Sequence, residues 1–218
     1  EDYDYTTNIH KFAAVYEDQT PRRAGRNTIE EQTLILKMPV TPTSAVDKTK
    51  TDFGAMGIAL NGVSLFNENA APGDEITDEL FTFDQCSGHP ENRGTYHYHV
   101  DPVCLIQKLG GKVNEVSKTD SGTTYNWLED SGDNAGLLLG FLMDGFPVYG
   151  PIGNGEKDCK ANAVPAIDEY NGHLHCTADF SSGSYHYHVK TATQGGKNDP
   201  VFWITNNYFY GEPGLIGQ

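Results

Sequence analysis

The tetrapeptide Tyr-His-Tyr-His occurs twice in this chain, at residues 96–99 and 185–188. Residues two apart on a β-strand point to the same face, so each copy presents two imidazoles on one side and two phenols on the other. Paired imidazoles at a fixed spacing are ligands that transition metals bind. We therefore predict four metal ligands, His97, His99, His186 and His188.

Two further histidines lie upstream of the tetrapeptides, each directly after a glycine: His89 and His173. Glycine permits a close backbone approach, so we predict that both histidines fold back as completing ligands. Glu91 aligns with His175 (175 − 91 = 84), and we expect these two as variable members of the ligand set. Because glutamate and histidine differ in metal preference, two separate sites would not be chemically identical.

The motifs belong to a longer duplicated block. The segment from Gly57 matches the segment from Gly140, an offset of 83 (140 − 57), and an Asp-x-x-x-Gly-His element recurs at Asp84 and Asp168, an offset of 84 (168 − 84). The tetrapeptides are offset by 89 (185 − 96). A small change in the offset from one block to the next indicates an internal duplication with loop insertions. We predict two pseudo-equivalent halves, about 53–109 and 137–190, which share one site or hold one each.

Two turn signals organise the halves into hairpins. Asn61-Gly62 and Asp144-Gly145 each lie between short apolar runs, a pattern typical of a β-hairpin. Pro147 follows the second turn and favours an edge strand or a bulge. An apolar run at residues 33–38 predicts a further strand, and residues 200–204 predict a buried one.

No segment shows a sustained helical period, so the sequence predicts a mainly β fold. We expect a single β-rich domain, sandwich- or barrel-like, with long loops and short helical turns at residues 105–109 and 165–170. Residues 1–52 would form an N-terminal arm with the first strand, and 53–218 the repeat domain. The polar insertion at 110–136 would be a surface lid or a flexible excursion. The tetrapeptide tyrosines would pack in the core.

Composition excludes several function classes. The net charge of −15 disfavours nucleic acid and anionic membrane surfaces as partners, and the partner we expect is a metal ion. No apolar run approaches the ~20 residues of a membrane span. The chain begins at Glu1 rather than Met, which suggests a processed form of a secreted or periplasmic protein.

Four cysteines support an oxidising compartment, because an even count in an exported chain usually forms disulfides. Three pairings are possible. We favour Cys86 with Cys104 and Cys159 with Cys176, since these close modest loops, of 18 and 17 residues, around the histidines. In the competing interpretation Cys176, next to a histidine, is a soft copper ligand.

Asp84 and Asp168 precede the Gly-His dipeptides by four residues, and two roles remain open for them. Each carboxylate either orients a ligand imidazole through its second nitrogen or forms an Asx turn leading into the glycine.

These residues resemble the YHYH domain family, which is named for the tetrapeptide and occurs mostly in exported proteins. The resemblance is carried by the hairpin at residues 140–150, the Asp-x-Cys-x-Gly-His element at 84–89 and the tetrapeptide itself, and spans roughly residues 53–189. Ser64 replaces the expected proline in the first hairpin, and Tyr170 replaces the expected cysteine in the second Gly-His element. The resemblance implies export and a metal-binding residue set, and it implies no reaction.

The sequence therefore predicts an exported protein that binds copper, or as second choice zinc, through His-x-His pairs. Two other classes stay open: a secreted metalloenzyme (a copper oxidase or a zinc hydratase or hydrolase), and an extracellular structural or interaction domain. An open coordination position would distinguish the enzyme, because azide or cyanide would then perturb the metal spectrum.

Overall fold

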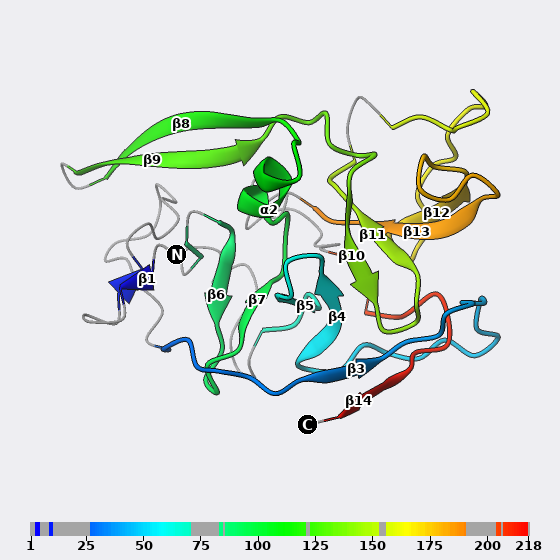
Figure 1. Ribbon diagram of the computed structural model, residues 1–218, viewed down its shortest axis with the longest axis horizontal. Coiled ribbons are helices and arrows are strands. Elements are labelled where there is room, and N and C mark those ends of the chain that lie inside the picture. The colour runs from blue at the N-terminus through cyan, green and yellow to red at the C-terminus, as the bar shows by residue number, and fades with distance from the viewer. Residues whose placement is uncertain are drawn as a thin grey trace.

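The computed structural model describes residues 27–70, 83–84, 86–120, 123–152, 156–190, 204–205 and 207–217, together with the short strands at 3–4 and 9–10. The described part is mainly β, which confirms the predicted class. Its centre is an eight-stranded mixed sheet in the order β12-β13-β11-β10-β4-β5-β7-β6 (Figure 1). The sheet is open, with β12 and β6 as its outermost strands, and three two-stranded sheets accompany it.

Each half of the chain supplies four strands of the sheet. The first half contributes β4 (Ala55–Ala59), β5 (Ser64–Phe66), β6 (Gly88–Pro90) and β7 (Tyr96–Tyr98). The second half contributes β10 (Leu138–Leu142), β11 (Pro147–Tyr149), β12 (Gly172–His175) and β13 (Ser184–His188). In both halves an antiparallel hairpin joins a parallel strand that carries the tetrapeptide, and the Gly-His strand closes the edge. The two halves therefore share one strand order and one pattern of strand pairing.

The two halves meet through β4 and β10, which pair antiparallel. Ile58 faces Phe141, its own counterpart at the offset of 83, so a pseudo-two-fold axis passes between them. A Cβ atom at Gly57 would lie 2.5 Å from the Phe141 carbonyl oxygen, and one at Gly140 would lie 2.3 Å from the Ile58 carbonyl oxygen. Glycine is required at both positions because the strands approach so closely there.

Both predicted hairpins are present, with turns between β4 and β5 and between β10 and β11. The positive φ angles fall on Gly62 (84°) and Gly145 (83°). The preceding Asn61 and Asp144 side chains are instead used to bind tyrosines, as described below. Pro147 is the first residue of β11, which pairs on both sides and is therefore not an edge strand; of the two expected alternatives, the pairing of β10 with β11 shows the register shift of a bulge, between Leu138 and Gly140. A proline is tolerated there because the first residue of a strand can lack a ladder donor.

The insertion at 110–136 is more regular than predicted. Strands β8 (Val113–Asp120) and β9 (Thr123–Asp130) pair antiparallel along their whole length as a ribbon beside helix α2 (Val103–Lys108) (Figure 1). Its Val, Thr, Tyr and Trp content favours strand, which outweighs its polarity.

Helix α2 confirms the helical turn expected near residues 105–109. The turn expected at 165–170 is wrong: the segment is irregular, and Asp168 uses its carboxylate to form an Asx turn there. No helix in the described part of the chain is long and apolar enough to cross a membrane.

The remaining strands lie outside the large sheet. The run at 33–38 forms β3 (Ile35–Lys37), which pairs with β14 (Leu215–Gly217). Strands β1 (Tyr3–Asp4) and β2 (Ile9–His10) pair with each other, while the rest of the predicted arm up to residue 26 lies outside the described residues. The strand predicted at 200–204 also falls outside them, except for Ile204, which is fully buried.

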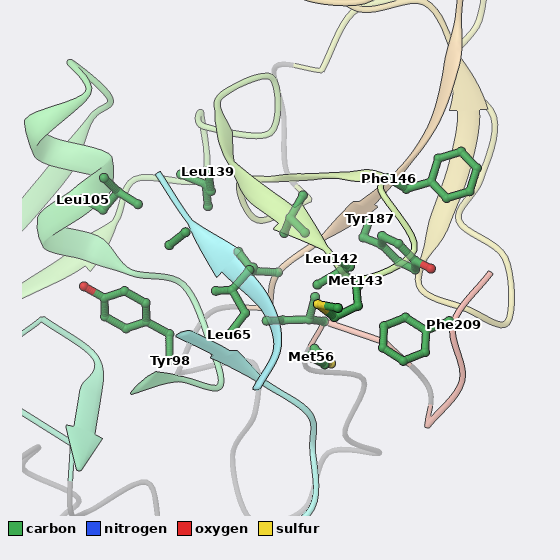
Figure 2. Close-up of a cluster of buried hydrophobic side chains, with 14 of the residues drawn as sticks. Met56, Leu65, Tyr98, Leu105, Leu139, Leu142, Met143, Phe146, Tyr187 and Phe209 are labelled. Carbon is green, nitrogen blue, oxygen red and sulfur yellow. The ribbon is translucent and has the colours of Figure 1, made fainter. Parts of the chain in front are cut away.

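The hydrophobic core lies where the hairpins meet the tyrosines of the tetrapeptides (Figure 2). Leu65, Leu142 and Val148 are fully buried in it, and Tyr98 and Tyr187 pack among them. The prediction that the tetrapeptide tyrosines are core residues is confirmed. With the tyrosines committed to the core, the alternating histidines are directed to the other face of each strand.

Candidate metal centres

Four imidazoles of the second half surround one carboxylate oxygen. The Nε2 atoms of His173, His175, His186 and His188 lie 2.9, 2.8, 3.1 and 3.2 Å from Oε1 of Glu156. The ligand atoms of the first three histidines and Glu156 all lie within 4.8 Å of one another. The histidines are buried. Strands β12 and β13 supply the imidazoles, and the loop after β11 supplies the carboxylate.

The opposite ring nitrogens of this group are all committed to backbone oxygens. The Nδ1–H groups donate to carbonyl oxygens of Pro165 (2.7 Å), Cys176 (2.9 Å), Ser184 (3.1 Å) and Gly150 (2.7 Å). A carbonyl oxygen can only accept, so Nδ1 carries the proton and a neutral ring has its lone pair on Nε2. If all four rings were neutral, four lone pairs and a carboxylate would converge on one point. Either a bound cation or a second proton, carried on Nε2 of one or more rings and donated to Glu156, removes this repulsion.

Burial keeps at least part of this group neutral. It lowers the pKa of His186, against the opposing effect of Glu156. For Glu156, burial raises the pKa, but hydrogen bonds from His173, His186 and His188 outweigh it and hold the pKa well below the usual range. The carboxylate is therefore ionised and the His186 imidazole favours its neutral form, which are the states in which both bind metals.

Three imidazoles of the first half form a corresponding group. The ligand atoms of His89, His97 and His99 lie within 4.8 Å of one another, and all three side chains are buried. The Nε2 atoms of His97 and His99 are 3.0 Å apart. Their Nδ1–H groups donate to Thr95 O (2.9 Å) and Asn67 O (2.5 Å), so two lone pairs again face each other. Burial, and then the charge of His99, lower the pKa of His97 well below its usual value.

The surroundings of the first group are more apolar. Phe66 stacks on His97 with ring centroids 3.8 Å apart, and the fully buried Phe83 meets His89 edge-on at 4.8 Å. Glu68, on the loop after β5, is buried, and its pKa is raised by that burial to about 7. It interacts electrostatically with His99 but does not belong to the convergent group.

The tyrosines of each tetrapeptide hold the strands through matching contacts. Tyr96 donates to Asp84 (2.7 Å), and Tyr185 donates to Asp168 (2.9 Å). The hairpin-turn residues meet the other two tyrosines, since Asn61 donates to Tyr98 (3.1 Å) and Tyr187 donates to Asp144 (2.5 Å). The tyrosines thus fix the position of the strands whose other face carries the histidines.

Asp84 and Asp168 form Asx turns, which is the second of the two roles that the sequence left open for them. Asp84 accepts the Cys86 and Gly88 amides, and Asp168 accepts those of Tyr170 and Gly172, which makes both Asx turns. In the described contacts neither carboxylate meets an imidazole; each binds a tyrosine. The adjoining glycines leave room for these phenols, because a Cβ on Gly88 would lie 2.5 Å from the Tyr96 ring.

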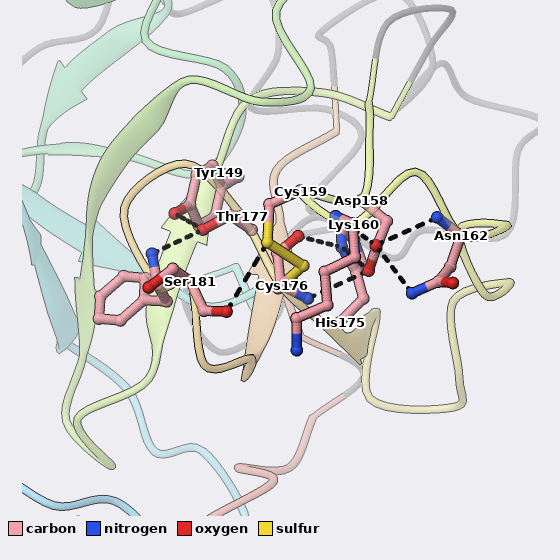
Figure 3. Close-up of a disulfide and its surroundings, with 10 residues drawn as sticks. Tyr149, Asp158, Cys159, Lys160, Asn162, His175, Cys176, Thr177 and Ser181 are labelled. Atoms are coloured by element: carbon pink, nitrogen blue, oxygen red, sulfur yellow. Dashed lines mark hydrogen bonds and ion pairs between the residues drawn. A yellow bond between two sulfur atoms is a disulfide. The ribbon is translucent and has the colours of Figure 1, made fainter.

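Both favoured disulfides are present, Cys86–Cys104 and Cys159–Cys176. The alternative of Cys176 as a free copper ligand is therefore wrong. Figure 3 shows that the second disulfide lies beside His175, and Asp158 accepts the Cys176 amide (3.4 Å). This disulfide ties the loop that carries Glu156 to the strand that carries His175.

The predicted site residues divide as follows. Seven predicted histidines fall into two groups, three in one half and four in the other. Glu91 joins neither group: its Oε1 accepts the Thr95 amide (3.2 Å) across a turn. Sequence reasoning missed Glu156 and Glu68. Both lie on loops that follow equivalent strands, but the copies do not align there, so only a search of those loops for acidic residues would have found them.

Two separate buried groups of imidazoles, one near each edge of the sheet, can therefore hold a metal ion. The sequence profile of the family described as YHYH protein matches residues 35–166. That range contains the first histidine group and Glu156, and ends before β12. No curated protein and no solved structure matches the chain.

Proposed function

We propose that this chain, which belongs to the YHYH protein family, is an extracytoplasmic protein that binds transition metal ions at two histidine sites. The observation that carries the proposal is the convergence of four Nε2 atoms within 2.8–3.2 Å of one Glu156 oxygen. A cation entering this group replaces those contacts with shorter bonds of about 2.0–2.2 Å. The two disulfides support an oxidising compartment.

Copper is the metal that the donors favour, with zinc second. Imidazole nitrogens suit both ions, and copper(II) binds a given nitrogen site more tightly. Structural zinc sites are almost always four-coordinate, whereas the second group offers four imidazoles and a carboxylate. The proposed ligands are His173, His175, His186, His188 and Glu156 in the second site, and His89, His97 and His99 in the first.

Elemental analysis of the untagged protein, purified without chelator, tests the proposal. We expect about two copper or zinc ions per chain, one for each group. The single variants His97→Ala and His186→Ala should each lose one ion, and the double variant should lose both. His10→Ala, which changes the one histidine outside residues 89–188 of the sequence, is the matched control.

A wild-type protein that contains no metal, and takes up none from micromolar copper or zinc, would sink the proposal. The convergent histidines would then serve a structural role, and the double variant would change stability alone.

A further inference from the structure

We propose that His188 makes the second site selective for copper(II) over zinc. The other four donors of this site form a compact set that either metal can use, and His188 adds a fifth donor whose position suits copper(II). This inference rests on the proposed metal binding and identifies the side chain that decides which metal is preferred.

The compact set consists of three imidazoles and one carboxylate. The rings of His173, His175 and His186 form a nearly equilateral triangle, with centroids 4.6, 4.7 and 4.6 Å apart. Their ligand atoms and that of Glu156 all lie within 4.8 Å of one another. Three imidazole nitrogens and a carboxylate oxygen are donors of the number and kind that a four-coordinate zinc ion takes.

His188 approaches this set from one side. It does not belong to the group whose ligand atoms all lie within 4.8 Å of one another, although its Nε2 is 3.2 Å from Oε1 of Glu156. Its ring centroid is 4.9 Å from that of His173 and 5.2 Å from that of His186. The ring is fully buried, and its Nδ1–H donates to the Gly150 carbonyl oxygen at 2.7 Å. His188 is therefore held in place as a fifth donor.

The spacing between His188 and His173 points to a right angle at the metal. Their Nε2 atoms are 3.0 Å apart. Two nitrogens that bind one ion at about 2.1 Å lie about 3.4 Å apart in a tetrahedral site and about 3.0 Å apart at a right angle. When no ion is bound, a proton on one of the two nitrogens holds them at this separation, so an ion replaces it with little movement of the rings. Right angles are the geometry of the square-planar and tetragonal sites that copper(II) prefers.

The number of donors acts in the same direction. A four-coordinate zinc ion would leave one of the five buried donors unbound, which costs free energy. A tetragonal copper(II) ion has room for all five. His188 therefore adds more to the affinity for copper(II) than to the affinity for zinc.

The test uses the full chain with His97→Ala/His99→Ala, which leaves the second site alone. Competition titrations with chelators measure the copper(II) and zinc affinities of the metal-free protein, with and without His188→Leu. Leucine fills the space of the ring, so that water does not replace the lost nitrogen. Copper(II) affinity should fall about a hundredfold, the upper end of the loss caused by removing a ligand's supporting partner, and zinc affinity by less than about tenfold.

His175→Leu in the same background is the matched control. It removes a member of the compact set, so it should lower the copper(II) and zinc affinities by similar factors. Cobalt(II) absorption reports the coordination number, because four-coordinate cobalt(II) absorbs visible light more strongly than cobalt(II) with more ligands. The cobalt(II) bands should intensify in His188→Leu. His188→Asn keeps a donor for the Gly150 carbonyl and repeats the test if leucine disrupts the fold.

The outcomes separate this inference from the proposed function. Equal losses of copper(II) and zinc affinity in the His188 variants, or unchanged copper(II) affinity, would overturn the inference and leave metal binding in place. A background protein that binds no metal, beside a wild type that binds one ion, would remove the second site and the inference with it. If neither protein takes up copper or zinc, the proposed function itself fails.

Discussion

The two halves of this sheet are alike in backbone and unlike in what surrounds their histidines. Strand order, register, hairpin turns, Asx turns and tyrosine contacts recur in both halves. The differences lie in the loops after β5 and β11: the second half brings Glu156 into the imidazoles, and among the described residues of the first half no carboxylate joins them. The shared sheet geometry therefore positions the imidazoles, while the loops determine which further side chains join them.

The largest effects are expected at the axis that relates the halves. Gly57→Ala and Gly140→Ala each place a Cβ within 2.5 Å of a carbonyl oxygen of the facing strand. Because backbone must move, each should lower the free energy of unfolding by at least about 3 kcal/mol. Gly62→Ala, with a positive φ but open space around it, should cost about 1 kcal/mol. Urea denaturation measures all three, and clearly unequal losses for Gly57 and Gly140 would break the equivalence of the halves.

The two disulfides should contribute equally to the stability of the protein and unequally to its metal binding. Cys86→Ala/Cys104→Ala and Cys159→Ala/Cys176→Ala open loops of 18 and 17 residues, so each should cost roughly 3 kcal/mol. The second pair alone holds the Glu156 loop against β12, so its loss should weaken copper binding at the second site. Competition titrations with a copper chelator compare the two variants. Equal copper affinities would show that the loop holds Glu156 without the disulfide.

The two carboxyls should give pH dependences of opposite sign. The pKa of Glu68 is raised from 4.5 to about 7, so the folded protein keeps a proton that the unfolded chain releases in that range. Stability from this group is therefore lost as pH rises from about 4.5 to 7. Glu68→Gln should exceed the wild type by about 2 kcal/mol above that range, allowing for partial screening.

The pKa of Glu156 is lowered, so its stabilisation is present above its unfolded value and is lost as pH falls towards the folded one. Glu156→Gln should therefore be less stable than the wild type at neutral pH. Denaturation of the chelator-treated wild type and of both variants, at pH values from about 4 to 8, measures these differences in stability. A stabilising effect of Glu156→Gln would contradict the assignment of its hydrogen bonds.

The smallest expected difference in stability is between variants of two buried tyrosines. Tyr187→Phe removes the donor to Asp144 and the acceptor of the Tyr210 amide, so it should cost about 2 kcal/mol. Tyr98→Phe removes one neutral contact with Asn61 and should cost about 1 kcal/mol. Denaturant midpoints distinguish them, and a larger loss for Tyr98 would reverse the comparison.

Much of this arrangement was predictable because the duplication repeats it. The alternation of Tyr and His fixed which side chains share a face, and two matching Gly-His elements predicted which further histidines join them. The disulfide pairing followed from loop length. Each of these inferences depends on short-range spacing, which a strand transmits directly into geometry.

What sequence could not supply came from long-range contacts. Glu156 reaches its site because a loop and a disulfide place it, and no local pattern encodes that contact. Asp84 and Asp168 were ambiguous because an Asx turn and an imidazole partner need the same residue. Glu91 aligned with His175 by number, yet its side chain was taken by a turn amide.

The central strand pair has a consequence for how such a molecule arises. Along β4 and β10 the pairs 57 with 142, 58 with 141 and 59 with 140 read the same from either half. One half on its own would present β4 as a self-complementary edge, ready to join a second copy. The architecture of the chain is that of a symmetric homodimer whose two subunits are joined in a single polypeptide. Fusion allows each subunit of such a dimer to diverge, and the two unequal histidine groups are consistent with that divergence.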